Sequence, residues 1–436
     1  MTGPPGVVIA APNSGCGKTT VTMALLGAFT RQGTTVGPCK IGPDYIDPMF
    51  HTAACGRPAY NLDLWAMRPA TRAECMARAA QDAELVIAEG VMGLFDGAVG
   101  EAASTAEAAA RTGWPVVLVV DAARQAHSVA ALVAGFRDFR RDITLAGVIL
   151  NGVGSDRHAA ILRTALAGIG VPVLGALPRQ ADLAMPERHL GLVPAGEHPD
   201  LAAFLEHAAG VAETHIDLAR LREAARPGAT SAPDGSTPAL PPPGQRIAVA
   251  RDAAFCFAYP HLLDAWHAAG AEIASFSPLA DEAPPPGCDA VFLPGGYPEL
   301  HAGTLAANET FRHGMHAAAD AGALIYGECG GYMTLGETLT DAGGTAHRML
   351  GLLPVATSFA EPRLHLGYRT IRPNPGTPLP WGGELRGHEF HYARVVREDP
   401  EIPFARMSNA HGADLGPAGA VSGRVAGSFA HVIDAA

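Results

Sequence analysis

One stretch decides the fold of the first half of this chain: GVVIAAPNSGCGKTT, residues 6–20. Val7 to Ala10 form an apolar run typical of a buried strand, and the segment from Thr19 onward, TTVTMALLGAF, is helix-like. A glycine-containing turn between a strand and a helix brings backbone N–H groups and the positive end of a helix dipole to one point. The stretch therefore predicts a phosphate-binding loop at the end of the first strand.

Individual side chains of this loop have predicted tasks. Lys18 would reach the β- and γ-phosphates of a nucleotide, and the hydroxyl of Thr19 would help to hold Mg²⁺. The usual pattern G-x-x-x-x-G-K-[ST] is not fully met, because Pro12 stands where its first glycine should be. The alternative interpretation is an ordinary glycine turn that caps a helix. We expect the ATP-binding residues to be Gly15, Gly17, Lys18, Thr19 and Thr20.

Strand-like and helix-like runs alternate beyond this loop. Further apolar runs lie at residues 85–88, 116–120 and 147–150, with alanine-rich, helix-like segments between them. Apolar strands that alternate with helices predict an α/β fold with a doubly wound parallel sheet.

The composition changes between the two halves of the chain. Residues 223–245, REAARPGATSAPDGSTPALPPPG, are rich in Pro, Gly, Ser and Ala and have no apolar period, which indicates a linker. A second α/β pattern begins at residue 246 and continues through residues 290–293 and 323–326. We therefore predict an ATP-binding domain at 1–195, a helical and Pro-rich linker at 196–245, and a second doubly wound domain at 246–436.

The bulk composition argues against several classes of protein. The 436 residues carry a formal net charge of −12, which disfavours general binding to nucleic acid or to membrane surfaces. Seven cysteines without a C-x-x-C pair fit a reducing cytoplasm better than a disulfide scaffold or a zinc site. Neither a signal peptide nor an apolar run of about 18 residues is apparent, so we expect a cytoplasmic protein without a membrane span.

Carboxylates that follow strand-like runs are candidates for metal binding. Asp44 lies in KIGPDY, Glu89 lies in AEG, and Asp121 follows the run at 116–120. Mg²⁺ prefers oxygen ligands, and doubly wound sheets bind ligands at the carboxyl ends of their strands. Each carboxylate could instead cap a helix or a turn. Lys40, near Asp44, could neutralise charge on a transferring phosphoryl group.

A second motif, YGECGGYM at residues 326–333, places a cysteine on a tight turn. A nucleophile on a strand-to-helix elbow is exposed at the positive end of the helix, so we expect a lowered pKa of the Cys329 thiol. The N–H of Gly330 can point at an oxyanion, and Gly296, in LPGGY, could supply a second donor. The alternative for Cys329 is a small buried residue.

A cysteine nucleophile needs a base, and His431, in GSFAH, is our choice. His388 and His391, in GHEFHY, are competing bases or structural groups.

Together these motifs resemble those of the cobyrinic acid a,c-diamide synthase family, including its cobalt-free hydrogenobyrinic acid members. The resemblance covers nearly the whole chain through eight segments: SGCGKTT, KIGPDYIDPMFH, AEGVMGLFDG, PERHLGL, LPGGYPEL, GECGGYM, LGYR and GHEFHY. It implies an N-terminal P-loop amide-ligase domain like dethiobiotin synthetase, which phosphorylates carboxylates with ATP and Mg²⁺. It also implies a C-terminal class I glutamine amidotransferase domain.

The resemblance assigns roles to single residues. Lys18, Thr19, Asp44 and Glu89 would serve the nucleotide and the metal, Cys329 would be the nucleophile, and His431 its base. We further expect Lys40 to take part in catalysis and Tyr45, Asp96 and Arg57 to contact the substrate, although the Asp-Gly pair at Asp96 is also a common turn.

The implied reaction runs in steps. Cys329 releases ammonia from L-glutamine, ATP converts the a- and c-acetate carboxylates of a corrin into acyl phosphates, and ammonia displaces the phosphate. A polycarboxylate needs cations in its pocket. The candidates, each of which could be an ordinary surface group, are Arg57, Arg68, Arg188 and His189. Class I glutaminases usually carry a Glu two residues after the catalytic His, but Ile433 stands there, so a Cys–His dyad would have to suffice.

Two alternatives stay open on the sequence alone. One is a related amidotransferase for another tetrapyrrole or another set of carboxylates, such as cobyric acid synthase. The other is a partitioning-type ATPase switch, which usually carries a lysine where Asn13 stands and would have no use for Cys329. The presence of cobalt, the order of the two amidations and the oligomeric state also stay open, with a homodimer as one option.

Overall fold

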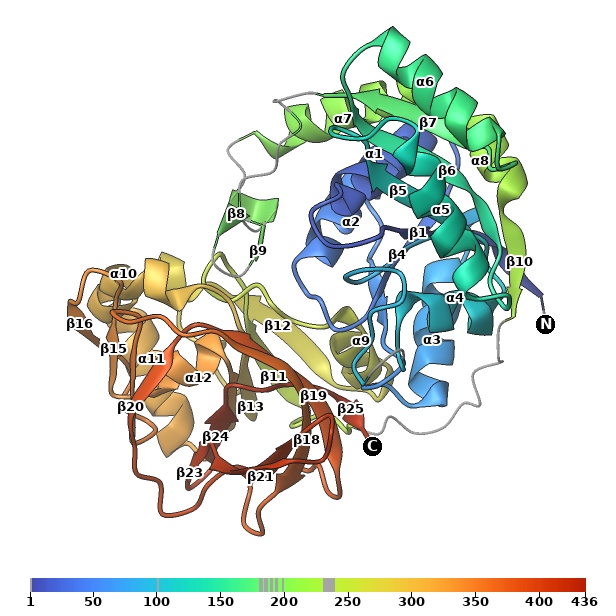
Figure 1. Cartoon of the computed structure of the whole chain (residues 1–436). Helices are drawn as coiled ribbons and strands as arrows, with labels where there is room; N and C mark the ends of the chain where they lie inside the picture. Colours follow the sequence, from blue (N-terminus) through green and yellow to red (C-terminus); the bar gives the residue numbers. More distant parts are fainter. Residues whose placement is uncertain are drawn as a thin grey trace. The chain divides into compact units, whose positions relative to one another are not determined.

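The computed structural model describes residues 2–99, 102–179, 183, 187–188, 191–192, 195–197, 200–229 and 240–436. These residues form two compact units, the first built mainly from residues up to 229 and the second from residue 240 onward. Figure 1 draws the first unit in blue to green and the second in yellow to red. Within the described ranges, no helix has the length and apolar character needed to cross a membrane.

The first unit is organised around one large sheet. Its parallel strands lie in the order β3-β2-β4-β1-β5-β6-β7, and β10 (Arg226–Ala229) pairs antiparallel with the start of β1. The bounds are β1 (Thr2–Ala10), β2 (Val36–Ile41), β3 (Tyr60–Leu62), β4 (Leu85–Glu89), β5 (Val116–Asp121), β6 (Leu145–Val153) and β7 (Val173–Pro178). The predicted doubly wound parallel sheet is confirmed. The chain adds β2, β3 and β4 on one side of β1 and β5, β6 and β7 on the other. The loop after β1 therefore lies at a topological switch point of the sheet.

The sheet is covered by helices that share its apolar core. They are α1 (Lys18–Arg31), α2 (Asp47–Cys55), α3 (Pro69–Ala80), α4 (Thr105–Thr112), α5 (Ser128–Phe139), α6 (Asp156–Ala167), α7 (Leu201–His215) and α8 (Leu218–Ala224). Two further short pairs of residues, β8 (Glu187–Arg188) and β9 (Gly191–Leu192), form a small ribbon.

The helices α7 and α8 are part of this core. Phe204, Ala208 and Ala212 recur along α7 at helical spacing and are buried, and α7 packs against α1 (Figure 1). Leu218 and Leu221 of α8 join the same cluster. Residues 201–229 therefore lie within the first unit, although the sequence placed them in a linker at 196–245, because the apolar period of α7 went unrecognised beside the Pro-rich stretch. Residues 230–239 lie outside the described residues.

The second unit contains a six-stranded sheet of order β12-β11-β13-β14-β24-β23, in which only β23 runs antiparallel to its neighbour. Its strands are β11 (Arg246–Ala250), β12 (Glu272–Phe276), β13 (Ala290–Leu293), β14 (Leu324–Glu328), β23 (Ala420–Ser422) and β24 (Val425–Ser428). The helices of this unit are α9 (Pro260–Ala268), α10 (Ala302–Ala307), α11 (Glu309–Asp320) and α12 (Gly330–Leu335). The second predicted α/β domain is thus confirmed in its architecture.

Two antiparallel-rich sheets complete the second unit. One has the order β22-β21-β18-β19-β25 and the other the order β16-β15-β17-β20. Their strands are β15 (Thr338–Thr340), β16 (Ala346–Arg348), β17 (Val355–Ser358), β18 (His365–Pro373), β19 (Leu385–His391), β20 (Arg394–Glu398), β21 (Ala405–Asn409), β22 (Asp414–Ala418) and β25 (His431–Ala435). The chain passes from β24 in the parallel sheet to β25 in the antiparallel sheet within two residues, so His431 lies at the corner between the two sheets.

Candidate functional sites

The predicted phosphate loop joins β1 to α1, and its shape depends on glycine. Gly15 and Gly17 have φ angles of 83° and 85°, a left-handed region that strains other residues. A methyl group at Gly17 would also collide with the side chain of Asn151, whose amide donates to the carbonyl of Cys16 at 3.0 Å. The turn that begins α1 is therefore held open by glycine and braced from the end of β6.

The lysine of the loop is buried against a neighbouring turn. Lys18 donates from Nζ to the carbonyl of Met92 at 2.7 Å. Burial lowers the pKa of Lys18, and the charge of Lys40 adds to this effect. The turn after β4 also contacts the loop, because Leu94 N–H donates to the carbonyl of Ala11 at 2.9 Å. These contacts align the lysine with the strand ends where a nucleotide would lie.

Beside the loop lies a cluster of buried charges. Glu89, at the carboxyl end of β4, accepts through Oε1 from the hydroxyl of Thr19 at 2.8 Å and from Lys40 Nζ at 3.1 Å. Its other oxygen lies 2.6 Å from Nε2 of His51. Asp47, the first residue of α2, accepts from Thr19 at 3.3 Å and pairs with Lys40. The cluster brings carboxylate and hydroxyl oxygens together next to a phosphate loop.

The charges of this cluster stabilise one another. Burial alone would raise the pKa of Glu89, but Lys40 and His51 hold it well below its usual range. Burial opposes the charge of Lys40, but Asp47 and Glu89 raise the pKa of its ammonium above the ordinary value. Burial, reinforced by the nearby charge of Asp44, raises the pKa of Asp47. Lys40 therefore favours the ionised form of Glu89, whereas burial and the charge of Asp44 outweigh Lys40 at Asp47.

The aspartate expected to serve the metal, Asp44, makes other contacts in the structure. Asp44 accepts through Oδ1 from the N–H groups of Ile46 at 2.8 Å and Asp47 at 3.2 Å, so it caps the turn before α2. Its Oδ2 lies 3.7 Å from Lys40 Nζ. The aspartate that contacts Thr19 is Asp47, which the sequence analysis missed. The available signal was its place in the same KIGPDYIDP segment, at the start of a helix.

Other predicted residues lie apart from this cluster or serve turns. Arg57 donates to the carbonyl of Gln81, which precedes β4 and so lies at the amino edge of the parallel sheet, whereas Glu89 lies at its carboxyl edge. The structure therefore does not bring Arg57 to the loop. Asp96 is exposed and accepts from Gly93 N–H at 3.0 Å, within the turn beside the loop. Asp121 accepts from Ala123 N–H at 2.9 Å and caps the turn after β5.

The buried side chain of Tyr45 lies in the loop between β2 and α2. The side chain of Arg188 and the whole of His189 fall outside the described residues.

The second candidate site is built on the predicted elbow. Cys329 follows β14 directly and caps α12 with φ 48°, a positive value that strains a residue with a side chain. Its N–H donates to the carbonyl of Ser428 at 2.9 Å. A methyl group at Gly331 would collide with the carbonyl of Leu293. The glycines after Cys329 thus allow the first residues of α12 to pack closely against β13.

The environment of the thiol differs from the sequence-based expectation. Cys329 is only 1% exposed, and burial raises the pKa of its thiol, with the charge of Glu299 adding to the effect. The backbone of Gly330 opposes this rise. The expected lowering by the helix does not prevail, because α12 has only six residues and desolvation of a thiolate at this depth costs more.

His431 lies next to this cysteine. A methyl group placed at Gly295 would collide with the imidazole of His431 and lie 3.2 Å from Cβ of Cys329. Burial lowers the pKa of His431 to about 3, and His388 and His391 add to the shift. His388 lies opposite His431 in the register between β19 and β25. Of the three candidate histidines, His431 is the one whose ring flanks the cysteine through Gly295.

The two predicted oxyanion donors are neighbours. A methyl group at Gly330 would lie 2.9 Å from the backbone nitrogen of Gly296. Among the hydrogen bonds recorded for the described residues, none uses the N–H of Gly296. The pair Gly296 and Gly330 therefore offers two adjacent amides beside Cys329, which suits a developing oxyanion.

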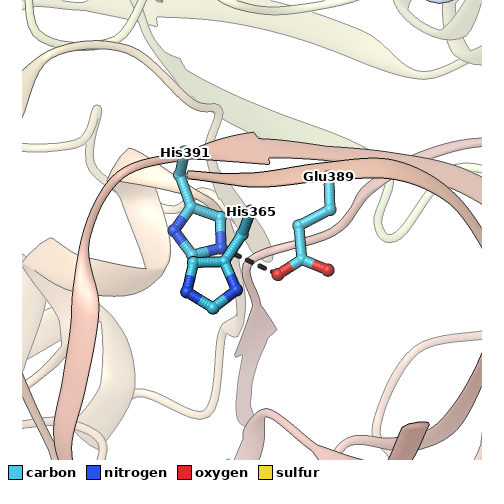
Figure 2. A group of neighbouring side chains, drawn as sticks. All are labelled: His365, Glu389 and His391. Atoms are coloured by element: carbon cyan, nitrogen blue, oxygen red, sulfur yellow. Dashed lines mark hydrogen bonds and ion pairs between the residues drawn. The ribbon is translucent and has the colours of Figure 1, made fainter. Parts of the chain in front are cut away.

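A cluster of possible metal ligands lies on the neighbouring sheet. Figure 2 shows His365, Glu389 and His391, whose ligand atoms lie within 4.8 Å of one another. Glu389 is already paired, with Nε2 of His391 at 2.7 Å and Nε of Arg369 at 2.5 Å. Burial would raise the pKa of Glu389, but His391 and Arg369 lower it to about 2. Arg369 thus supplies the positive charge that a metal ion would supply. We therefore interpret His365, Glu389 and His391 as a hydrogen-bonded network rather than a metal site.

This network lines a cavity of about 300 Å³. Phe429 and Ala430, which precede His431, line the same cavity, and the ring of Phe429 stacks on His391 with centroids 3.9 Å apart. The cavity therefore borders the segment that carries His431.

Comparisons with known proteins cover both units. The model of the CobQ/CobB/MinD/ParA nucleotide binding domain matches residues 7–193, and that of the CobB/CobQ-like glutamine amidotransferase domain matches residues 246–436. The second match excludes an ATPase switch that lacks a glutaminase. A solved structure of PurLQS from Thermotoga maritima, 24% identical, covers 43% of this chain and 87% of that chain with a TM-score of 0.32, too low to support an argument.

Curated relatives match along nearly the full length. Hydrogenobyrinate a,c-diamide synthase of Brucella anthropi is 56% identical over 431 residues, which is 98% of both chains. The synthase of Rhizobium meliloti is 54% identical over 98% of this chain and 99% of the relative, and that of Rhodobacter capsulatus is 52% identical over 99% of both. With a nucleotide-binding domain followed by a glutamine amidotransferase domain, this chain belongs to the hydrogenobyrinate a,c-diamide synthase family.

Proposed function

We propose that this protein is an ATP- and glutamine-dependent ligase that amidates the a- and c-acetate carboxylates of a corrin in cobalamin biosynthesis. One observation carries the proposal. A single chain combines a phosphate loop beside buried carboxylates with a cysteine elbow beside a histidine, and its relatives with this combination are named for the two amidations. Hydrogenobyrinic acid is the favoured substrate, and cobyrinic acid is the alternative.

In the first unit, the backbone of Gly15 and Gly17 would cradle the phosphates, with Lys18 and Thr20 alongside. A carboxylate oxygen of the corrin attacks the γ-phosphorus, ADP leaves, and an acyl phosphate forms. Lys40 would offset charge on the phosphoryl group as it transfers.

The oxygens of Thr19, Asp47 and Glu89 fit a divalent ion, because they gather within hydrogen-bonding distance of the Thr19 hydroxyl. Mg²⁺ held there would neutralise phosphate charge. Asp44 keeps an outer position, since its Oδ1 accepts from backbone N–H groups and its Oδ2 lies 3.7 Å from Lys40 Nζ.

In the second unit, His431 takes the proton of the Cys329 thiol while the sulfur attacks the side-chain amide carbon of glutamine. The amides of Gly296 and Gly330 stabilise the resulting oxyanion. His431 returns the proton to the amide nitrogen, and ammonia leaves. Water then hydrolyses the thioester and releases glutamate. Because burial favours both the protonated thiol and the neutral imidazole, proton transfer and attack are expected to be concerted.

Ammonia from this unit displaces phosphate from the acyl phosphate and leaves the amide. We also propose a cytoplasmic location, consistent with seven cysteines that form no disulfide. The homodimer stays a prediction that sedimentation can test.

Mass spectrometry of the product tests the proposal. Hydrogenobyrinic acid and cobyrinic acid are each incubated with the enzyme, ATP, Mg²⁺ and glutamine. Two successive mass steps, each replacing a hydroxyl by an amine, are expected with the true substrate and not when ATP is omitted. Hydrolysis of glutamine without a mass step on either corrin would point to another acceptor carboxylate.

A further inference from the structure

We propose that Glu328, the residue immediately before the nucleophile, positions His431 and replaces the carboxylate that related glutaminases carry two residues after their histidine. Ile433 occupies that usual position, and its hydrocarbon side chain cannot hydrogen-bond an imidazole. The inference rests on the proposed glutaminase activity and adds a residue to it.

The topology of the second unit brings the two residues together. Glu328 ends β14, which pairs in parallel with β24, and Glu328 lies opposite Ser428 in that register. The chain then turns from β24 into β25 and places His431 beside the end of β14. Oε2 of Glu328 lies 3.7 Å from Nδ1 of His431, and the two residues are 2% and 0% exposed. At 3.7 Å the two atoms are too far apart for a hydrogen bond, and long contacts of this kind in active sites commonly shorten when substrate binds.

The other oxygen of Glu328 is fixed. Oε1 accepts from the N–H of Val432 at 2.9 Å and from the hydroxyl of Tyr326 at 3.0 Å. Val432 follows His431 directly, so the carboxylate is tied to the backbone of the histidine as well as facing its ring. With Oε1 held in this way, Oε2 is the oxygen left to serve the imidazole.

The opposite edge of the ring faces the nucleophile. The position of a methyl group at Gly295 is 2.9 Å from Nε2 of His431 and 3.2 Å from Cβ of Cys329. Nδ1 thus faces Glu328, while the Cε1–Nε2 edge of the ring borders the same Gly295 position that Cβ of Cys329 borders. An ionised Glu328 favours the tautomer with hydrogen on Nδ1, which leaves the Nε2 lone pair to take the thiol proton.

Other groups also face the imidazole of His431, and their effects on the ring must be distinguished from that of Glu328. The backbone of Phe257 hydrogen-bonds the ring, and the ring of Tyr259 packs edge-on with centroids 6.5 Å apart. From β19, the charges of His388, His391 and Glu389 act on the ring. The rival explanation is that the Phe257 backbone alone sets the tautomer.

The protonation of Glu328 supplies a distinguishing signature. Burial raises the pKa of Glu328 to about 8, against the opposing hydrogen bonds from Val432 and Tyr326. A protonated Glu328 would donate to Nδ1 and leave the hydrogen of the ring on Nε2, where it blocks uptake of the thiol proton. Glutaminase turnover should therefore rise with pH around 8, as Glu328 ionises.

The test is Glu328→Gln in the full-length enzyme. The amide keeps the volume and an oxygen for Val432, but it presents NH₂ to the imidazole. We expect the kcat for glutamine hydrolysis to fall about 10- to 100-fold, less than loss of a general base would cause. KM should change little, and the rise near pH 8 should disappear. Amidation supported by ammonium salt should stay at the wild-type rate, which also shows that the variant is folded.

Two further variants complete the test. Glu384→Gln is the matched control, since Glu384 pairs with Arg372 at 2.8 Å outside the site, and it should keep the wild-type kcat and pH profile. Glu328→Asp keeps an ionisable group and should recover part of the rate together with a pH-dependent rise, which a purely structural role would not produce.

The outcomes separate the possibilities. A wild-type kcat and an unchanged pH profile in Glu328→Gln would overturn the inference. The backbone of Phe257 would then be the group that sets the tautomer of His431. If that variant fails to fold, a Glu328→Asp enzyme that keeps the full wild-type kcat at every pH would overturn the inference equally, because the shorter carboxylate would then not matter. Absence of glutamine hydrolysis in the wild-type enzyme would instead contradict the proposed function itself.

Discussion

At the scale of single residues, Asp44 and Asp47 lie three positions apart and make different contacts. Asp47→Asn should reduce ATP-dependent amidation about 100-fold or more, as expected for a lost charge at a phosphoryl-transfer site. Asp44→Asn should cost less than about tenfold, because a side-chain amide oxygen can still accept the two backbone N–H groups. Both rates are measured with ammonium salt as nitrogen source, at limiting and saturating Mg²⁺. Equal losses of amidation rate in the two variants would show that Asp44, like Asp47, serves the metal.

Glu328 also makes the stability of the protein depend on pH. Its pKa of about 8 lies above the ordinary value of 4.5, so the folded state binds more protons than the unfolded state between these limits. The stability contributed by the protonated group is full below pH 4.5 and is lost as pH rises through 8. Relative to wild type, Glu328→Gln should gain on the order of 3 kcal/mol in unfolding free energy between pH 5 and pH 9. Urea unfolding at both pH values measures the difference, and a variant that gains nothing would contradict the buried, protonated carboxyl.

At the scale of elements, the turn that follows β13 and contains Gly295 sets the distance between Cys329 and His431. Gly295→Ala should reduce glutamine hydrolysis about 100-fold, because its methyl group would displace the imidazole of His431 from a position that must be accurate within about 1 Å. Ammonium-supported amidation should be unchanged. Gly303→Ala, in α10, is the matched control, since its methyl group would meet no atom closer than 3.6 Å. A Gly295→Ala enzyme with normal glutaminase would show that the ring can move freely.

The elements also show which parts of the molecule a sequence can predict. The strand–loop–helix at β1 and the elbow at β14 were predictable, because the glycines, the cysteine and the apolar runs that form them are adjacent in the chain. The contact between His431 and Cys329 had to come from resemblance, because it arises from the corner between β24 and β25. The proximity of Glu328 to His431 depends on the register of the strands, which no single segment specifies. The contact of Asp47, rather than Asp44, with Thr19 depends on the residue at which α2 begins. The raised pKa of the Cys329 thiol depends on depth of burial, which no local pattern encodes.

At the scale of the whole molecule, the two units divide the chemistry. Cys329→Ser should lose glutamine-dependent amidation, because a hydroxyl is a far weaker nucleophile than a thiol here. The same variant should still amidate the corrin with a high concentration of ammonium salt, at a pH that frees ammonia. Product formation with each nitrogen source is followed by mass spectrometry. Loss of both activities in a folded variant would contradict the division, and full use of glutamine would show that Cys329 is not the nucleophile.

The depth of Cys329 has a consequence for redox chemistry. A thiol that is 1% exposed and kept protonated reacts slowly with peroxide and with alkylating reagents, which attack accessible thiolates. Cys55, Cys256 and Cys288 are more accessible and should be modified first. The resting enzyme thus shields its nucleophile from oxidation by the same packing that raises the pKa of the thiol, and it can lose its outer thiols to oxidation before its glutaminase is damaged.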